Sequence, residues 1–449
     1  MSCNWPTVTV EEIASESPNA LATGPFGSAI SSKFFTDSGV PVIRGSNLST
    51  DTGVRLKDEG IVFVSEEKAK EFSRSVARVG DLVFTCWGTI NQVGYIDGTS
   101  NWDEYIISNK QMKLTVDTTK VDPRFLYYVF SSPLKQREIL SNGIGAAIPG
   151  FNLGQLRKHT FQLPPLLTQS AISDILELLD KKANKNAQIN QTLEEMAQAI
   201  FKSWFVDFDP VKAKMNGEQP EGMDADTASL FPDKLIESEL GLIPEGWEVQ
   251  EAKKQLDVLR GFSYKGQGLV SSIDEGILMH NLNSVLEGGG YKYSGLKYYS
   301  EEVKDKFDIK EGDVLVANTE QGHNHLLIGY GAMVPKHLAH GFFSHHTFRV
   351  RPTKNSNITP EFIEQLFGKG RFVRQVQGFT NGTTVNMLPV AGMEMPQFVV
   401  PPKALAQNFT KLVKPMKAMI EENHKTNIEL AKLRDTLLPK LLSDEITLD

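Results

Sequence analysis

The stretch TQSAISDILELLDKKANKNAQINQTLEEMAQAIFKSW, residues 168–204, decides the fold of this chain. Its apolar residues recur at alternating spacings of three and four, which is the a/d pattern of a coiled-coil helix. Two polar positions interrupt the pattern near its middle. The predicted seam consists of Ile172, Ile175, Leu179, Lys182, Asn186, Ile189, Leu193, Met196 and Ile200.

A second stretch repeats this pattern about 237 positions later, with Asn423 standing where the first has Asn186. Either helix alone could equally be a core helix of a globular domain. Because the long seam recurs with its polar position in place, the pattern favours an exposed pair of helices. The second predicted seam consists of Phe409, Leu412, Met416, Met419, Asn423, Thr426, Leu430, Leu433 and Leu437.

The repeat extends beyond the helices, so the chain is a tandem duplication of one domain and one helix. Two copies are too few for a solenoid, which needs about three or more repeats. The matched positions are Gly24 with Gly261, Gly39 with Gly276, Gly80-Asp81 with Gly312-Asp313, Asp122-Pro123 with Thr359-Pro360, and Pro164-Pro165 with Pro401-Pro402.

Each copy is predicted to be α+β or mixed α/β, because short apolar runs bounded by Gly, Pro and Asp indicate strands. Helices are predicted to begin at Asp122-Pro123 and Thr359-Pro360, where proline suits the first turn. The expected strands are 40–43, 61–64, 81–85, 93–96 and 112–116 in the first copy, and 276–279, 313–316, 326–330 and 347–351 in the second.

Composition places this 449-residue chain, with 40% hydrophobic and 23% charged residues, among globular proteins of two or three domains. We expect it in the cytoplasm and not in a membrane, since it shows no leader and no apolar run of about 18 residues. Cys3 and Cys86 are too few for a disulfide framework. The net charge of -8 does not exclude DNA, because residues 207–245 carry much of the acidic excess.

Polar loops lie at equivalent places in the two copies, and their side chains suit contacts to base edges in the major groove. Different side chains at matched positions would let two domains read two different sequences, although ordinary polar loops that have drifted would look similar. The candidate DNA-binding residues are Arg44, Ser46, Asn47, Thr89, Asn91, Gln92, Lys110 and Gln111 in the first copy, and Asn281, Asn283, Thr319, Gln321, His323, Asn324, His345 and His346 in the second.

Motifs for catalysis are not found in the sequence. The histidines between His280 and His346 lack zincin spacing, and Gly288 to Gly290 lacks the lysine of a phosphate loop, so neither metal nor nucleotide is expected. Asp207-Phe208-Asp209-Pro210 is only weakly similar to the Asp-Pro-Pro-aromatic motif of amino methyltransferases and lacks its second proline. We therefore expect a chain that is not itself an enzyme.

The duplicated plan, the run from Gly39 to Gly45 and the stretch from Leu193 to Phe208 resemble the specificity subunit of type I restriction-modification systems. The resemblance implies two target-recognition domains, pseudo-twofold, separated by two long antiparallel coiled-coil helices and reading a bipartite, asymmetric site in double-stranded DNA. The implied ranges are domain one at 1–163, spacer helix at 164–206, acidic linker at 207–241, domain two at 242–400, second helix at 401–442 and tail at 443–449.

The resemblance also implies partners in phage defence. These are modification (methyltransferase) subunits, two of them in our expectation, and restriction subunits that translocate and cleave DNA. S-adenosylmethionine, ATP and magnesium belong to these partners, and no cofactor is expected in this chain. A purely structural tether and a self-sufficient DNA methyltransferase are the alternatives; the first leaves the paired domains unexplained and the second lacks its motifs.

The repeat also predicts a register for the helix pair. If the helices run antiparallel, Asn186 faces Asn423, Ile172 faces Leu437 and Ile200 faces Phe409. A helix of this length, at about 1.5 Å per residue, would place the two half-sites more than one turn of DNA apart.

Overall fold

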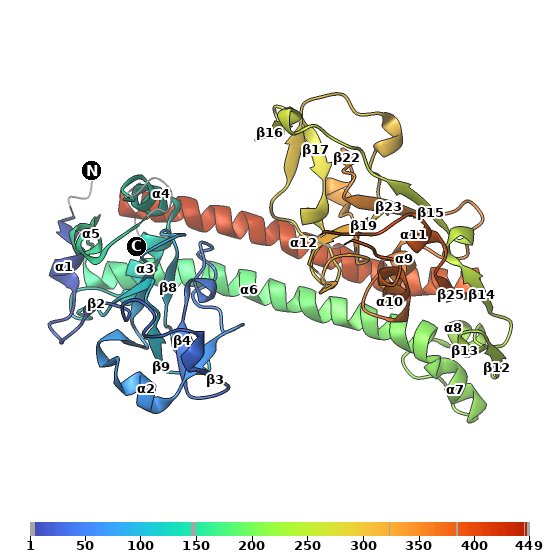
Figure 1. The fold of residues 1–449 in the computed structure, drawn as a ribbon, viewed down its shortest axis with the longest axis horizontal. Coiled ribbons are helices and arrows are strands. Elements are labelled where there is room, and N and C mark those ends of the chain that lie inside the picture. Colours follow the sequence, from blue (N-terminus) through green and yellow to red (C-terminus); the bar gives the residue numbers. More distant parts are fainter. Residues whose placement is uncertain (1–4, 145–149, 323, 383–384, 444, 447–449) are drawn as a thin grey trace. The chain divides into compact units, whose positions relative to one another are not determined.

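The structure is a computed structural model that describes residues 5–144, 150–322, 324–382, 385–443 and 445–446. The chain divides into two compact units, unit 1 (Met1–Ala187 and Asn423–Asp449) and unit 2 (Gln188–Glu422). The division passes through the two longest helices, α6 (Leu166–Lys202) and α12 (Lys403–Leu442), labelled in Figure 1. Each unit therefore contains one copy of the repeated domain and a part of both helices.

Both long helices begin directly after a Pro-Pro pair, as the sequence predicts. Proline disfavours helix in the residue before it, so Pro164-Pro165 and Pro401-Pro402 separate each domain from the helix that follows. Helix α6 contains no internal proline, whereas α12 continues through Pro415 and Pro439, each of which removes one backbone hydrogen bond.

Unit 1 contains two sheets and a two-stranded ribbon. The first sheet has the strand order β2-β10-β7-β8, and the second has the order β3-β5-β4-β9-β6 with β4 and β9 parallel. The ribbon pairs β1 with β11. The strands are β1 (Thr7–Thr9), β2 (Leu21–Thr23), β3 (Phe35–Thr36), β4 (Val40–Ile43), β5 (Val62–Val64), β6 (Val76–Arg78), β7 (Leu82–Thr85), β8 (Val93–Tyr95), β9 (Glu104–Ile107), β10 (Gln111–Leu114) and β11 (Thr160–Gln162).

Unit 2 repeats this arrangement. Its sheets have the orders β15-β23-β19-β21 and β16-β18-β17-β22, with β17 and β22 parallel, and its ribbon pairs β14 with β25. The matching strand orders confirm the duplication, although among the described residues the second sheet has five strands in unit 1 and four in unit 2. The strands are β14 (Glu248–Glu251), β15 (Leu256–Arg260), β16 (Leu269–Val270), β17 (Ile277–His280), β18 (Lys297–Tyr299), β19 (Val314–Ala317), β20 (Thr319–Gln321), β21 (Gly331–Met333), β22 (Phe342–Phe343), β23 (Thr347–Pro352), β24 (Val385–Met387) and β25 (Gln397–Val400).

One glycine contact shows how closely the copies correspond. A Cβ on Gly24 would lie 1.9 Å from the backbone oxygen of Ser108, and a Cβ on Gly261 would lie 2.1 Å from that of Ser344. Both distances are far below van der Waals contact, so only glycine fits at either place. Ser108 and Ser344 each begin a candidate recognition segment, and the glycine fixes where that segment starts.

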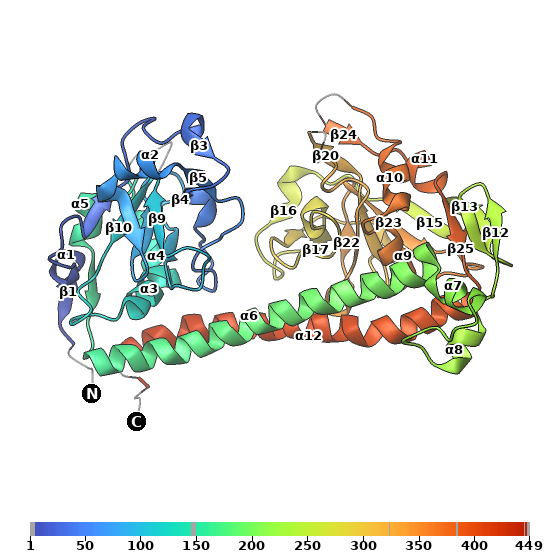
Figure 2. The same cartoon turned by 90° about the horizontal axis from the view of Figure 1, so that it is seen from below.

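The shorter helices are also placed alike. Helices α3 (Pro123–Ser131) and α9 (Pro360–Leu366) begin at the predicted Asp122 and Thr359 caps, and in Figure 2 each lies against the long helices. The remaining α-helices are α1 (Val10–Ile13), α2 (Glu66–Lys70), α4 (Pro133–Ser141), α5 (Leu153–Lys158), α7 (Asp209–Met215), α8 (Ala225–Ser229), α10 (Arg371–Gln377) and α11 (Ala391–Glu394).

The region after α6 has no counterpart among the few described residues that follow α12. A π-helical turn at Ser203–Asp207 follows α6, then α7, α8 and a hairpin of β12 (Leu235–Ser238) with β13 (Gly241–Pro244). The aromatic side chains of this region join the core of unit 2, where Trp204 and Phe205 contact Phe409 of α12. The linker is therefore built into unit 2.

The two helices run antiparallel within each unit. In unit 1, Arg434 Nη1 lies 2.8 Å from Asp180 Oδ1, while Asn186 Nδ2 donates to Asn427 Oδ1 at 2.9 Å. In unit 2, Asn190 Nδ2 donates to the backbone oxygen of Ile420. Partners that advance along α6 move backwards along α12, as predicted. Asn186 was predicted to face Asn423, but it donates to Asn427, which lies one helical turn further along α12. The predicted register is therefore displaced.

The predicted seam is wrong at several positions. Met196, Leu412, Met419 and Leu433 have exposed fractions of 41–52%, and Lys182 is also exposed. The buried stripe runs one residue further on at most turns. It includes charged residues, so an apolar pattern alone could not find it. Its members are Ile172, Leu176, Asp180, Asn186, Asn190, Ala197 and Phe201 in α6, and Phe409, Val413, Ile420, Arg434, Leu438 and Leu441 in α12.

One predicted strand of the second copy is also wrong. Residues 326–330 form bends and turns. Strand β19 pairs with β23 on one side and on the other with β21, which begins at Gly331. The polar loop before it contains β20, which pairs with β24. The partner of β20 lies more than sixty residues away in the chain, so local sequence could not indicate it.

Candidate nucleic-acid interface

Most of the first copy's candidate residues line a single pocket of about 480 Å³. Three segments bring them together: the turn after β4, the loop between β7 and β8, and the turn before β10. Six of the eight candidates lie in its wall. These are Arg44, Ser46, Thr89, Gln92, Lys110 and Gln111.

Exposure separates possible DNA contacts from structural residues. Ser46, Thr89 and Lys110 are exposed and Asn91 is half-buried, so these side chains can reach a ligand. Asn47 is fully buried and donates to the backbone oxygens of Lys57 and Glu59, so it holds a loop and cannot contact DNA. The expectation that Asn47 contacts bases is therefore wrong.

Gln92 and Gln111 support the pocket from within. Gln92 Nε2 donates to the backbone oxygen of Leu48, and Gln92 Oε1 accepts from Thr85 Oγ1, at 3.1 Å each. Gln111 is fully buried, and its Oε1 accepts from Ser108 Oγ. Both amides shape the pocket, and Gln111 is inaccessible to a base in this conformation.

Among the described residues, Arg44 Nε and Gln111 Nε2 are buried donors without a hydrogen-bond partner. Arg44 and the exposed ammonium of Lys110 give this wall positive charge. Such a surface suits groups rich in acceptors, which in DNA are phosphate oxygens and the major-groove edge of guanine.

Trp87 is a functional candidate that sequence reasoning passed over. It lies in the wall of the same pocket, has an exposed fraction of 51%, and packs on Gly150, where a Cβ would lie 2.6 Å from the indole ring. An exposed tryptophan in a polar loop was the available signal. Its flat surface can contact sugars or bases.

The second copy builds its candidate loop differently. Glu320 is 6% exposed, and its carboxylate accepts backbone N–H groups of Leu326, Leu327 and Ile328 at 2.8–3.1 Å. Asn386 Nδ2, in β24, donates to the backbone oxygen of Gly322. These bonds fix the polar loop, and they leave Gln321 and Asn324 exposed at its surface.

Other second-copy candidates are partly engaged. Thr319 is 5% exposed, with Oγ1 3.1 Å from His346 Nδ1, and the rings of His345 and His346 lie 3.9 Å apart. Burial, then the charges of His345 and Arg260, lower the pKa of His346, so this imidazole is neutral near pH 7. His346 is therefore a neutral hydrogen-bonding group rather than a fixed charge.

The last candidates lie after β17. Asn283 is exposed, whereas Asn281 is 7% exposed, accepts from the backbone N–H of Asn283 and donates to Met279 O. Asn281 is therefore a capping residue. Its neighbour His280 is fully buried, and burial lowers its pKa to about 4. His323 and Cys3 lie outside the described residues.

Metal and membrane features were searched over the same residues. No group of three or more His, Cys, Asp or Glu side chains in the described part of the chain could hold a metal ion. Among the described helices, none has the length and apolar character to cross a membrane. Cys86 is a free thiol whose burial raises its pKa to about 12.

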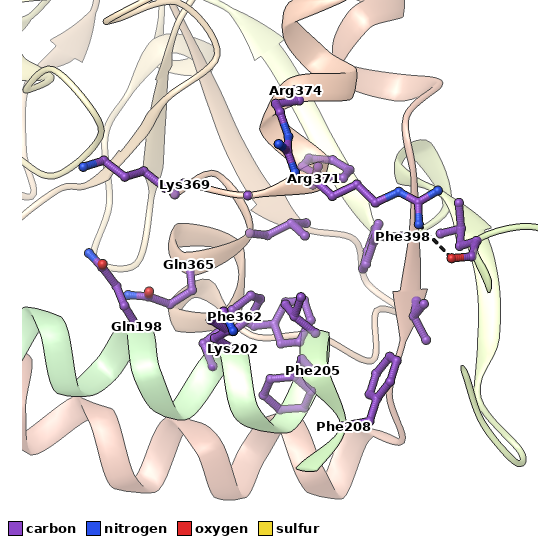
Figure 3. A pocket seen from close by; sticks show the side chains of 18 of the residues that line it. Gln198, Lys202, Phe205, Phe208, Phe362, Gln365, Lys369, Arg371, Arg374 and Phe398 are labelled. Atoms are coloured by element: carbon purple, nitrogen blue, oxygen red, sulfur yellow. Dashed lines mark hydrogen bonds between the residues drawn. The ribbon is translucent and has the colours of Figure 1, made fainter. Parts of the chain in front are cut away.

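A second pocket, of about 680 Å³, lies in unit 2 where α6 ends. Figure 3 shows Phe205, Phe208, Phe362 and Phe398 around it, with Arg371 and Arg374 of α10 on the opposite side. Arg371 Nη1 donates to the backbone oxygen of Leu240 at 2.7 Å. An apolar floor with a basic rim is suited to an apolar peptide segment that carries acidic groups.

Comparison with known proteins gives one family. The family model for the type I restriction modification DNA specificity domain matches residues 26–195. The HindI specificity subunit of Haemophilus influenzae is 24% identical over 404 residues, which cover 78% of this chain and 83% of that protein. The MjaIX specificity subunit of Methanocaldococcus jannaschii is 24% identical over 403 residues, covering 86% and 82%.

A solved structure supports the fold. The S subunit of a type I restriction-modification system from M. genitalium has a TM-score of 0.50 at 13% identity, with coverage of 98% of this chain and 96% of that one. The fold and the loops define a class of protein in which a recognition domain is duplicated and each copy is followed by a long helix. Residues 26–195 match the type I restriction modification DNA specificity domain, and most of the chain is similar to type I restriction enzyme specificity subunits.

Proposed function

We propose that this chain recognises a bipartite, asymmetric site in double-stranded DNA, with one half-site for each copy of the domain. One observation carries the proposal: the two copies share a strand framework but present different polar side chains at equivalent loop positions. The segment Ser108-Asn109-Lys110 in one copy corresponds to Ser344-His345-His346 in the other. A common scaffold with different contact groups is what reading two different sequences requires.

In the first copy, exposure and charge assign phosphate contacts and base contacts to different side chains. Arg44 and Lys110 supply positive charge for phosphates, which positions the domain without selecting sequence. Thr89 and Asn91 supply neutral hydrogen-bonding groups for base edges, where a good bidentate contact discriminates by about 1–3 kcal/mol.

The test is to map methylated adenines in cells that carry this chain with its methyltransferase. Asn91→Ala should relax one half-site only, and Gln321→Ala with Asn324→Ala should relax the other. Asn101→Ala, an exposed amide elsewhere in the first copy, is the matched control and should leave the site unchanged. If no variant alters the methylated sequence, the chain is a tether rather than a reader.

We further propose that catalysis belongs to partner subunits. Two modification subunits would supply methyl transfer from S-adenosylmethionine, and restriction subunits would supply ATP- and magnesium-dependent translocation and cleavage, in the cytoplasm. The pocket at the end of α6 is the candidate docking place for one modification subunit. Its apolar floor and basic rim support this assignment.

Lys369→Glu with Arg374→Glu, both on the rim, should weaken binding of the modification subunit and leave the sequence of the site unchanged. Co-purification of the two subunits measures the first effect, and methylation mapping at high subunit concentration measures the second. A change of sequence without loss of binding would place these residues in DNA recognition instead.

A further inference from the structure

Two ion pairs lie in the seam between α6 and α12, one in each unit. The pair in unit 1 is buried, and in the pair of unit 2 the Lys417 side chain is 15% exposed and the Glu194 side chain 35% exposed. In unit 1, Arg434 Nη1 lies 2.8 Å from Asp180 Oδ1, and both side chains are 8% exposed. In unit 2, Lys417 Nζ lies 2.7 Å from Glu194 Oε2 and 3.0 Å from Glu364 Oε2. In both pairs the acid across the seam belongs to α6 and the base to α12.

One member of each pair occupies the same position of the duplication, whereas Glu194 and Arg434 correspond to Ala431 and Ala197. Lys403 begins α12 237 positions after Leu166 begins α6, and Lys417 follows Asp180 by the same 237. Each also contacts its own domain: Tyr128 OH of α3 donates to Asp180 Oδ2 at 2.7 Å, and Glu364 of α9 pairs with Lys417. The position is therefore the same in both copies, and the sign of its charge is opposite.

The amide side chains of the seam are the same in both helices, so they do not distinguish α6 from α12. Asn186 and Asn190 of α6 correspond, at the same offset, to Asn423 and Asn427 of α12. The repeat thus places identical amides in both helices. An amide seam of this kind would suit two copies of α6, or two copies of α12, as well as one of each. Among the polar positions of the seam, the charged ones distinguish the two helices.

The repeat shows what a wrong pairing would bury. If α6 of a second chain replaced α12, Asp180 would take the place of Lys417 and face Glu194. If α12 of a second chain replaced α6, Lys417 would take the place of Asp180 and face Arg434. Either case puts like charges face to face in the seam, where partial burial leaves their repulsion poorly screened.

We propose that Asp180, Glu194, Lys417 and Arg434 select the pairing of α6 with α12 and exclude pairing of either helix with its own copy in a second chain. Buried ion pairs add little net stability, because desolvation offsets the attraction. They discriminate between partners strongly, because a mismatched pair keeps the desolvation cost and gains repulsion. The acidic helix and the basic helix thereby make the seam specific to one chain.

The full-length variant Glu194→Lys/Arg434→Glu should reverse this pairing preference with two substitutions and no change in net charge. Each helix then carries one acid and one base and complements its own copy, whereas the pairing of α6 with α12 buries like charges. Light scattering after size separation should give 49.9 kDa for the wild-type chain and at least twice that mass for the variant.

Capture distinguishes specific association from aggregation. A tagged variant chain should retain untagged variant chain at least tenfold better than untagged wild-type chain. Glu195→Lys/Lys432→Glu makes the same charge changes at exposed neighbouring positions and should stay at the mass of one chain. Glu194→Gln/Arg434→Gln removes the charges without creating complementarity and should not associate.

Three results would overturn the proposal: a Glu194→Lys/Arg434→Glu chain that keeps the mass of one chain, equal association of a control, or equal capture of variant and wild-type chains. None of these bears on DNA recognition, which is carried by loops away from the seam.

Discussion

Replacing Lys417 by methionine removes the ammonium group that compensates the buried carboxylate of Glu364. The Glu364 side chain is 9% exposed, and Lys417 Nζ lies 3.0 Å from its Oε2. Burial raises the pKa of Glu364 from its ordinary 4.5 even with Lys417 present, and the negative charge of Glu194 acts in the same direction. Without Lys417, the folded protein should take up a proton at Glu364.

The cost follows from this protonation. Protonating a carboxyl of ordinary pKa 4.5 at pH 7.0 costs about 1.36 kcal/mol for each of 2.5 pH units, or about 3.4 kcal/mol. This lies within the range of about 3–5 kcal/mol for breaking a buried ion pair. Because the folded-state pKa is raised, the native state binds more protons than the unfolded state above pH 4.5, so stability falls as pH rises through this window. At pH 5.5 the penalty should shrink to about 1.4 kcal/mol.

Urea unfolding of the full chain at pH 7.0 and pH 5.5 measures this penalty. The fluorescence of Trp204 and Trp247, both buried in unit 2, reports on the unit that contains the ion pair. Lys414→Met, on an exposed face of the same helix, is the control and should change stability by less than about 0.5 kcal/mol. A penalty below about 1 kcal/mol at pH 7.0, or one that is equal at the two pH values, would refute the reasoning.

Three further predictions concern the seam and the two loops. Cysteines introduced by Asn186→Cys and Asn427→Cys should form a disulfide readily under mild oxidation, because the two amides are hydrogen-bonded at 2.9 Å, whereas Asn186→Cys with Leu437→Cys should not. Equal trapping of both pairs would show that the register is not fixed. Glu320→Gln should speed hydrogen exchange at the amides of Leu326, Leu327 and Ile328 about tenfold or more, and relax the second half-site while leaving the first intact. Unchanged exchange would mean that the carboxylate does not hold the loop. Gln92→Ala should destabilise unit 1 by about 1–3 kcal/mol in thermal unfolding because it leaves Leu48 O and Thr85 Oγ1 unpaired, whereas Asn91→Ala should cost less than about 0.5 kcal/mol. The reverse order of costs would exchange the structural and reading roles assigned to these neighbours.

The fold could be predicted in outline because its signals are local and repeated. Pro164-Pro165 and Pro401-Pro402 mark the starts of the long helices, and Asp122-Pro123 and Thr359-Pro360 mark those of α3 and α9. The matched glycines predicted that the copies correspond. Each of these signals acts through the backbone conformation of a few neighbouring residues. The residue types that set this conformation are read directly from the sequence.

The details that failed depend on contacts between distant residues. The seam was assigned to apolar positions, but Asp180 and Arg434 are buried because each compensates the other across two helices. Strand β20 exists because β24 supplies its hydrogen-bond partners. Neither fact is visible in a window of neighbouring residues.

The candidate site was predicted by segment rather than by residue. Six of eight first-copy residues line one pocket, since the three polar segments follow or precede adjacent strands. Which side chains face outward could not be predicted, because an asparagine that caps a turn and one that reads a base have the same sequence context. Asn47 and Asn281 are of the first kind, and Asn91 and Asn324 are exposed enough to be of the second.

The connection that follows β19 in unit 2 is about twice as long as the one that follows β7 in unit 1, although both join neighbouring strands of matching sheets. Doubling the length of a loop costs only about 0.6 kcal/mol in closure entropy. A single hydrogen bond to an ionised group contributes about 1.5–3 kcal/mol, and Glu320 accepts three from its loop. The hydrogen bonds to one buried carboxylate therefore offset the closure entropy of a longer loop, so an inserted segment can be ordered at the surface. A protein built in this way can lengthen a candidate recognition loop by insertion, while its strand framework stays the same.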